Sequence, residues 1–291
     1  MGTTILRRYV LLGPVGRGGV STVYHAVDAH RGRPVAVKLL APTLAGDERA
    51  RANVRREALI TARLRHPSVP RVYDHGDAPL PDGTVVPYVV MDLLDGVALA
   101  GRLTGGALPW PESVRIAATV ADVLAVAHRR GYVHRDVAAH NVMLTAGGAK
   151  IIDFGLAAEV DPARPARPAD DVYALGALLC QMLTGRSPYP RATPAGAAHR
   201  RVAPTPVLAV PGLPASVSET CRACMTRQPA DRPGSAAVAL ALWDTLLRPP
   251  AAKEVRCPVT ARSVMTSAPG APRLTPYACS PTSAAMTSSI R

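Results

Sequence analysis

The chain has 291 residues, 48% of them hydrophobic and 19% charged, with a formal net charge of +13. A chain of this length and hydrophobicity can bury a sizeable core in one or two domains, which excludes disorder as its main state. No apolar run reaches the roughly 18 residues of a membrane span and no signal peptide is visible, so we expect a cytoplasmic protein.

The positive charge comes almost entirely from arginine, since Lys38, Lys150 and Lys253 are the only lysines. Aromatic residues make up only 4% of the chain and do not interleave with the basic ones. We therefore expect no nucleic-acid partner, although a basic surface for acidic partners stays open.

The five cysteines do not suggest a disulfide framework in a chain of this length without a signal peptide. Cys221 and Cys224 have the spacing of half a zinc site, but no second pair lies nearby. We favour the alternative that both are buried residues of a helix.

The first third of the chain predicts strands with one helix. β-Branched and apolar runs predict strands over 9–15, 22–28, 34–40, 69–75 and 85–92, with a turn at Asp82-Gly83. A basic amphipathic stretch predicts a helix over 49–64, which Pro67 brings to an end.

From about residue 96 the pattern becomes helical. Pro111 predicts the first position of a helix, and the almost entirely apolar run 172–183 predicts a central, buried helix. Ser235 predicts the N-cap of a last helix over 236–247. Residues 249–291 are rich in Pro, Ser, Thr and Ala without periodicity, and we expect a disordered tail there.

Two motifs in the strand-rich part have the chemistry of a phosphate site. Gly16, Gly18 and Gly19 occupy a turn between two strands, where backbone N–H groups without side chains can approach a polyphosphate. Lys38 follows on a strand, and its ammonium can hold phosphate oxygens if Glu57 of the next helix keeps it in place.

A third motif supplies oxygen ligands and a base. It comprises His134-Arg135-Asp136, then Asn141, and then Asp153-Phe154-Gly155. Carboxylate and amide oxygens suit Mg²⁺, and a carboxylate can accept the proton of an attacking hydroxyl.

These blocks, in this order, resemble the eukaryotic-type protein kinases, most closely the bacterial serine/threonine kinases, over residues 7–248. The resemblance implies an α+β, bilobal protein-kinase-like fold. A small β-rich N-lobe with one helix would span about 7–92, and a larger helical C-lobe about 96–248. Asp171 and Asp231-Arg232-Pro233 match two further positions of the family.

The resemblance also implies roles for individual residues, with ATP and Mg²⁺ as cofactors. Asp136 would accept the hydroxyl proton, Asn141 and Asp153 would bind Mg²⁺, and Asp171 would brace the catalytic loop. Met91 would be the gatekeeper, and Ser21 replaces the third glycine of the family's loop. The implied ATP-binding residues are Val15, Gly16, Gly18, Gly19, Ser21, Val23, Ala36, Lys38, Glu57, Met91, Asp92 and Leu94.

The sequence departs from the family at Ala138, where serine/threonine kinases have a lysine that contacts the γ-phosphate. The loss of one such charge would lower the rate by about 10²–10³. Our hypothesis is that His140 partly substitutes as a catalytic residue. The alternative is that His140 is an exposed neutral residue.

A second departure is the segment between Asp153 and Asp171, which has only 17 residues and no Ser, Thr or Tyr before Asp170. In the family this segment is longer, docks the peptide substrate and supplies a glutamate that pairs with the arginine matching Arg232. We expect little regulation by phosphorylation of this segment and poor phosphorylation of peptides.

We therefore expect ATP- and Mg²⁺-dependent transfer of the γ-phosphoryl group to Ser/Thr hydroxyls of a protein substrate, at full or reduced activity. Two alternatives stay open: a pseudokinase that binds nucleotide as a signalling scaffold, and a small-molecule phosphotransferase. The sequence predicts neither the substrate nor the oligomeric state.

Overall fold

The structure is a computed structural model that describes residues 4–154, 158–159, 167–188 and 208–248. All described residues belong to one compact unit, Met1–Pro249. The tail expected from residue 249 onward, most of the segment before Asp171, and Gly155 lie outside the described residues.

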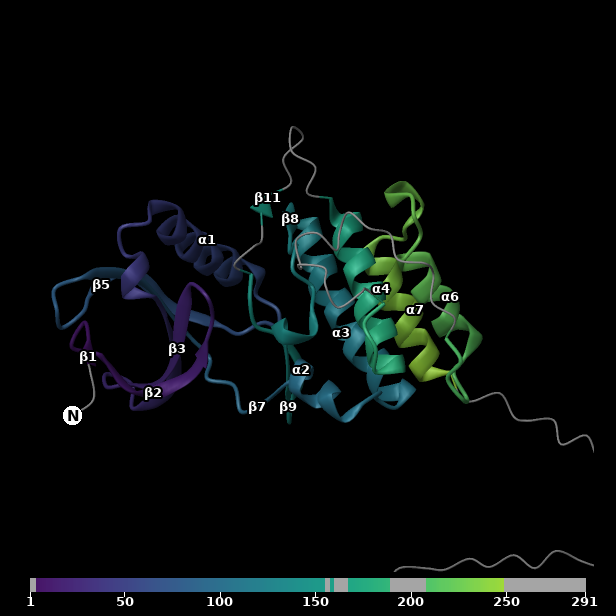
Figure 1. Cartoon of the computed structure of the whole chain (residues 1–291), viewed down its shortest axis with the longest axis horizontal. Helices are drawn as coiled ribbons and strands as arrows, with labels where there is room; N and C mark the ends of the chain where they lie inside the picture. The colour runs from purple at the N-terminus through teal and green to yellow at the C-terminus, as the bar shows by residue number, and fades with distance from the viewer. Residues whose placement is uncertain (1–3, 155–157, 160–166, 189–207, 249–291) are drawn as a thin grey trace, which may run out of the picture. The chain divides into compact units, whose positions relative to one another are not determined.

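The strand-rich part of this unit, in purple and blue in Figure 1, contains one antiparallel sheet. Its strand order is β1-β2-β3-β4-β6-β5. Its strands are β1 (Thr4–Ile5), β2 (Tyr9–Arg17), β3 (Ser21–Asp28), β4 (Arg33–Leu40), β5 (Val72–Pro79) and β6 (Val85–Met91). β4 is central and carries the apolar run that predicted it, with Val35, Val37 and Leu40 almost fully buried.

Helix α1 (Glu48–Leu64) packs against β6 and β5 of this sheet. Its N-cap is Asp47, whose carboxylate accepts hydrogen bonds from the backbone N–H groups of Arg49 and Ala50. Its C-cap is Arg65, which adopts the left-handed conformation two residues before Pro67. The apolar face of the predicted helix is buried, and Glu57 lies on that face.

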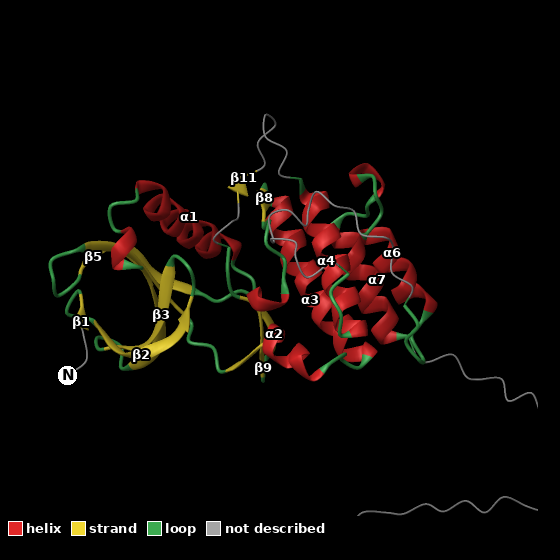
Figure 2. Ribbon diagram, in the orientation of Figure 1, coloured by secondary structure: helices red, strands yellow, loops and turns green. Residues whose placement is uncertain are grey.

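The later part is helical, as Figure 2 shows. Its helices are α2 (Leu99–Arg102), α3 (Trp110–Arg129), α4 (Pro168–Thr184), α6 (Ala215–Cys224) and α7 (Ser235–Leu247). α3 packs on α4 and α7, and α4 packs on α6. α4 is buried on nearly all sides, which confirms the prediction of a central helix, and it ends at Gly185 with φ of 70°. The α+β prediction, with strands first and helices later, is confirmed.

Short strands within the helical part were not predicted, because two to four residues show no measurable periodicity. They are β7 (Gly96–Ala98), β8 (Tyr132–Val133), β9 (Val142–Thr145), β10 (Gly148–Ile151) and β11 (Ala158–Glu159). β9 pairs with β7 and β10, and β8 pairs with β11. Short 3-10 turns cover Pro42–Leu44, Leu103–Gly105, Ala139–Asn141 and Pro229–Asp231.

The strand predicted over 69–75 was wrong in its bounds, since β5 covers Val72–Pro79. Val69 is held in a turn by a hydrogen bond from its N–H to the carbonyl of His66. β5 continues through poor strand formers because it pairs with β6 as far as Val85. Pairing between strands therefore overrides local propensity here.

Two predicted helix starts also need correction. Ser235 is the first residue of α7 rather than its cap, and the capping position is Gly234. The Ser235 hydroxyl bonds instead to His128, a partner far away in the sequence. Trp110 is the first residue of α3 and Pro111 is the second, so the helix begins one residue earlier than predicted.

Cys221 and Cys224 are buried in α6, as the helix alternative predicted, and the Cys221 thiol bonds to the carbonyl of Gly176. Among the residues that the structure describes, no group of three or more His, Cys, Asp or Glu side chains could hold a metal ion. Nor does any helix in the described ranges combine the length and apolar character needed to cross a membrane.

Candidate active site

Side chains that the family resemblance implies around the base and phosphates of ATP lie on one face of the large sheet. In the register of the strands, Val23 lies opposite Lys38 and Ala36 lies opposite Met91. Paired residues and residues two apart on one strand point to the same face. These four side chains therefore share one surface of the sheet.

The glycine-rich turn joins β2 to β3 beside this surface. Gly16 pairs with Val23, and the N–H of Gly18 bonds to the carbonyl of Ser21 at 2.8 Å. A Cβ atom built on Gly16, Gly18 or Gly19 would meet no heavy atom closer than 3.5 Å, and none of the three has a positive φ. The fold itself therefore does not demand glycine at these positions, and their backbone is left accessible to a ligand.

Lys38 and Glu57 form a buried ion pair between β4 and α1. The Lys38 Nζ lies 2.6 Å from Oε1 and 2.7 Å from Oε2 of Glu57, and both residues are less than 10% exposed. Asp153 adds a second carboxylate, with Oδ1 at 3.7 Å from the same ammonium. The structure thus brings together three predicted site residues from distant parts of the chain.

The electrostatics of the pair follow from its burial. Burial alone would lower the pKa of Lys38, but the carboxylates of Glu57 and Asp153 raise it above its usual value. Burial raises the pKa of the Glu57 carboxyl, and the ammonium of Lys38 opposes this change. Each charge is thus tolerated in the interior because its partner is present.

Asp136 lies in the loop after β8, where its carboxylate has two side-chain partners. Its Oδ2 accepts a hydrogen bond from Nδ2 of Asn141 at 2.9 Å and lies 3.3 Å from Nε2 of His140. The bond to His140 lowers the pKa of Asp136, and the same bond raises the pKa of His140. The side chain of His140 is 60% exposed, so it borders solvent as well as the carboxylate.

The backbone of this loop is held by Asp171 of α4. Its two carboxylate oxygens accept hydrogen bonds from the N–H groups of His134 and Arg135, each at 2.7 Å. Arg135 has φ of 69°, a strained conformation for a residue other than glycine. The bracing expected of Asp171 is therefore present in the structure.

Two residues that support Asp171 were missed by the sequence reasoning. Nε2 of His128 lies 2.9 Å from Oδ2 of Asp171, and Nδ1 lies 2.9 Å from the hydroxyl of Ser235. The three residues come from α3, α4 and α7, and no local pattern relates them. Only the helix packing reveals this buried chain of hydrogen bonds.

Phe154, the only phenylalanine of the chain, is 1% exposed. Its ring packs on the His134 ring with centroids 4.6 Å apart. This contact ties the segment that carries Asp153 to the loop that carries Asp136.

Arg232, for which the family resemblance implies a glutamate partner, has other partners in this structure. Its guanidinium donates to the carbonyls of Thr226 and Ala169, lies 3.3 Å from Asp170 and stacks over the ring of Tyr173. The side chain is only 6% exposed. Arg232 therefore holds the first turn of α4 directly.

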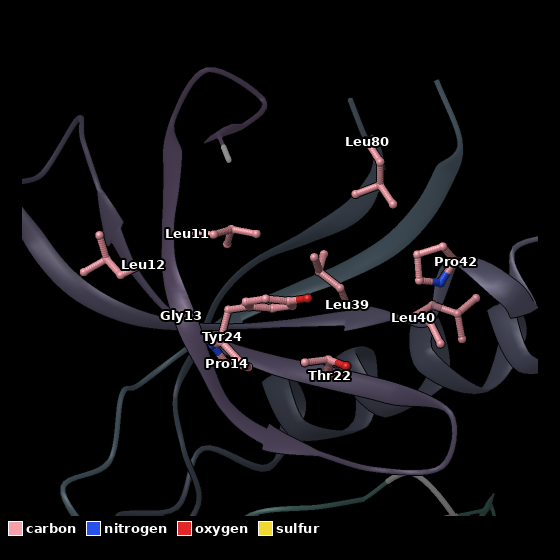
Figure 3. Close-up of a pocket in the computed structure, with 11 residues that line it drawn as sticks. Leu11, Leu12, Gly13, Pro14, Thr22, Tyr24, Leu39, Leu40, Pro42 and Leu80 are labelled. Atoms are coloured by element: carbon pink, nitrogen blue, oxygen red, sulfur yellow. The ribbon is translucent and has the colours of Figure 1, made fainter. Parts of the chain in front are cut away.

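A cavity of about 340 Å³ lies on the opposite face of the large sheet (Figure 3). Thr22, Tyr24 and Leu39 line it, and these residues alternate with Val23 and Lys38 along their strands. By this alternation the cavity is separate from the surface that carries Lys38.

The chain matches the family model of the protein kinase domain over residues 9–167. It is similar to the probable serine/threonine-protein kinase PknB of Corynebacterium glutamicum, with 34% identity over 78% of this chain and 40% of that protein. It is also similar to the serine/threonine-protein kinase PknL of Mycobacterium tuberculosis, with 32% identity over 88% of this chain and 70% of that protein. The chain thus spans less than half the length of the Corynebacterium relative.

Among solved structures, the chain is similar to the crystal structure of the PknI kinase domain of Mycobacterium tuberculosis. The TM-score is 0.67 at 27% identity, covering 84% of this chain and 97% of that one. Together with the matched family model and the ion pair, loop and carboxylates described above, these similarities show that the chain belongs to the protein kinase family.

Proposed function

We propose that this chain is an ATP- and Mg²⁺-dependent protein kinase that transfers the γ-phosphoryl group of ATP to Ser/Thr hydroxyls of a protein. The observation that carries the proposal is the placement of Lys38, Glu57 and Asp153 within one cluster of charges. Phosphoryl transfer needs positioned cations and carboxylates more than covalent chemistry, and this cluster supplies them.

The residues present fit an adenine nucleotide. The accessible backbone of Gly16, Gly18 and Gly19 would contact the phosphates, together with Ser21 and the ammonium of Lys38. Glu57 would keep that ammonium oriented. The base would lie against Val15, Val23, Ala36 and Met91, and the backbones of Asp92 and Leu94 would bond to it.

Asn141 and Asp153 would hold Mg²⁺. Nδ2 of Asn141 donates to both the carbonyl and the carboxylate of Asp136, so its Oδ1 is the group that remains for a metal. Asp153, with 40% of its side chain exposed, offers carboxylate oxygens. When bound, the metal would neutralise negative charge on the phosphates.

Asp136 would orient the attacking hydroxyl and accept its proton. The lowered pKa keeps its carboxylate ionised at neutral pH, and the hydrogen bonds from Asn141 and His140 fix its direction. Because ATP is produced and used inside cells, we place this reaction in the cytoplasm.

His140 would supply part of the positive charge that Ala138 lacks. It reaches the carboxylate of Asp136, where the transferred group would pass. His140→Arg should therefore raise the rate of phosphoryl transfer, and His140→Ala should remove most of it. Equal rates in all three proteins would contradict this role.

The proposal is tested by transfer of labelled γ-phosphate in the presence of Mg²⁺ to unstructured Ser/Thr-containing proteins, with small alcohols as a second set of acceptors. We expect slow transfer to protein hydroxyls by the wild type. Asp136→Asn should reduce the rate by about 10²-fold or more and leave ATP binding nearly unchanged. Transfer to small alcohols alone, or none by the wild type, would contradict it.

A further inference from the structure

Asp92 follows β6 and is held at three points by the neighbouring segment. Its N–H donates to the carbonyl of Arg71 at 3.0 Å, and its Oδ2 accepts from the N–H of Arg71 at 2.8 Å. Its Oδ1 accepts a hydrogen bond from the hydroxyl of Tyr73. The carbonyl is the remaining polar group of this residue.

A β-bulge places Tyr73 for this contact. Val72 pairs with Met91 and Asp74 pairs with Val90, so Tyr73 is an extra residue on β5 without a partner of its own on β6. Bulges turn a side chain away from its regular direction and are common beside functional sites. The irregular pairing thus has a specific result, a tyrosine hydroxyl directed at Asp92.

The Tyr73 ring is itself fixed by cations. The guanidinium of Arg33, from the start of β4, lies 3.6 Å from the ring centroid, and that of Arg71 lies 5.6 Å from it. The hydrogen bond to Asp92 is the largest cause that raises the pKa of the Tyr73 hydroxyl. The contact therefore joins residues on or directly beside three neighbouring strands, β4, β6 and β5.

We propose that Tyr73 is a positioning residue for the adenine base, because it holds Asp92 so that the backbone carbonyl of Asp92 faces the base. This inference rests on the proposed function, in which the backbones of Asp92 and Leu94 bond to adenine. The N–H of Asp92 is bonded to Arg71 and its carboxylate to Arg71 and Tyr73, so the residue cannot rotate without breaking these bonds.

The arrangement favours adenine over guanine. The carbonyl of Asp92 accepts a hydrogen bond from the exocyclic amino group of adenine, whereas guanine has a carbonyl oxygen at the same ring position. A carbonyl held in one direction leaves two acceptors facing each other when GTP is bound. Loss of the Tyr73 hydroxyl would relax this selection.

The test measures dissociation constants of Mg²⁺-ATP, Mg²⁺-GTP and Mg²⁺-tripolyphosphate by calorimetry for the wild type and Tyr73→Phe, which keeps the ring under Arg33. We expect Tyr73→Phe to weaken ATP binding by about three- to tenfold and leave tripolyphosphate binding unchanged. The KM for ATP should rise by the same factor, with kcat within about twofold.

Two further variants make the test specific. Tyr9→Phe removes a similar bond, in which the Tyr9 hydroxyl donates to the carboxylate of Asp74 at 2.6 Å. Asp74 follows Tyr73 on β5, and this variant should leave ATP binding unchanged. In an Asp92→Ala background, Tyr73→Phe should have no additional effect, because its partner is already absent.

The outcomes separate this inference from the proposed function. If the wild type binds ATP and Tyr73→Phe binds it equally well, or loses ATP and tripolyphosphate together, the positioning role is wrong and the kinase proposal stands. If the wild type binds no nucleotide, both are wrong.

Discussion

The Glu57 carboxylate holds the Lys38 ammonium with both oxygens, at 2.6 and 2.7 Å, although the two residues lie on different elements. The pair forms only when α1 packs on the sheet with Glu57 facing inward. The position of one helix therefore determines where the ammonium of Lys38 is held.

Glu57→Gln should lower the rate of phosphoryl transfer by about 10²-fold, because Lys38 loses a buried partner and moves toward Asp153. The rate is measured with labelled ATP, and the fold is checked by circular dichroism. Glu48→Gln is the matched control, since Glu48 is on the same helix with 77% of its side chain exposed. A Glu57→Gln protein as active as the control would contradict the role of the pair.

Asp77 anchors α1 to the sheet. Its carboxylate lies 3.1 Å from Arg51 and 2.8 Å from Arg55, both on α1. Asp77→Ala should increase hydrogen–deuterium exchange across α1 and leave exchange in α7 unchanged, because only the first helix loses a tether. Asp244→Ala, which breaks the exposed pair with Arg248, is the control and should leave α1 unchanged. Equal exchange in α1 for Asp77→Ala and wild type would show that Asp77 is not the anchor.

Gly176 allows α4 and α6 to approach closely. A Cβ atom at this position would lie 2.7 Å from Cβ of Cys224 and 2.8 Å from Cγ of Met225. Gly176→Ala should therefore reduce the free energy of unfolding by about 1–3 kcal/mol. Gly101→Ala in α2 meets no atom within 4 Å and should increase it by up to about 1 kcal/mol. Urea unfolding measures the free energy of unfolding of both variants. A Gly176→Ala protein as stable as wild type would refute the close approach of α4 and α6.

Asp28 makes the free energy of unfolding depend on pH in the acid range. The hydrogen bonds from Arg8, at 2.9 and 2.8 Å, lower the pKa of Asp28 to about 2. An unfolded aspartate has a pKa of about 3.9, so the stabilisation is fully present above that value and is lost as pH falls from about 4 toward 2.

The stability difference between wild type and Asp28→Asn should therefore be constant from neutral pH down to about pH 5 and should shrink below about pH 4. Urea midpoints at pH 6.5, 4.5 and 3.5 measure it. A difference that grows in acid would have the wrong sign for this account.

The candidate site residues could be recognised in the sequence because short motifs carry them. Lys38, Asp136 and Asp153 each lie within a few residues of the neighbours that mark them, and the structure places Lys38 beside Asp153 and Phe154 on the loop of Asp136. The longer strands and helices were also predictable, since their apolar periodicity is strong.

The supporting contacts could not be predicted, because they join residues that no local pattern relates. The bond from His128 to Ser235 spans 107 positions, and the contact of Tyr73 with Asp92 depends on a bulge in strand pairing. The serine was even misassigned as a cap, since its own sequence neighbourhood fits that role well. Such contacts are set by tertiary packing, which the sequence does not display.

The most direct test of the central claim is the affinity for ATP with and without Mg²⁺, measured by calorimetry on wild type and Asp153→Asn. We predict that wild type binds ATP much more tightly with Mg²⁺ than with a chelator, and that Asp153→Asn loses this dependence. Equal affinity under both conditions, or ATP binding that Asp153→Asn leaves fully dependent on Mg²⁺, would contradict a nucleotide bound between Lys38 and Asp153.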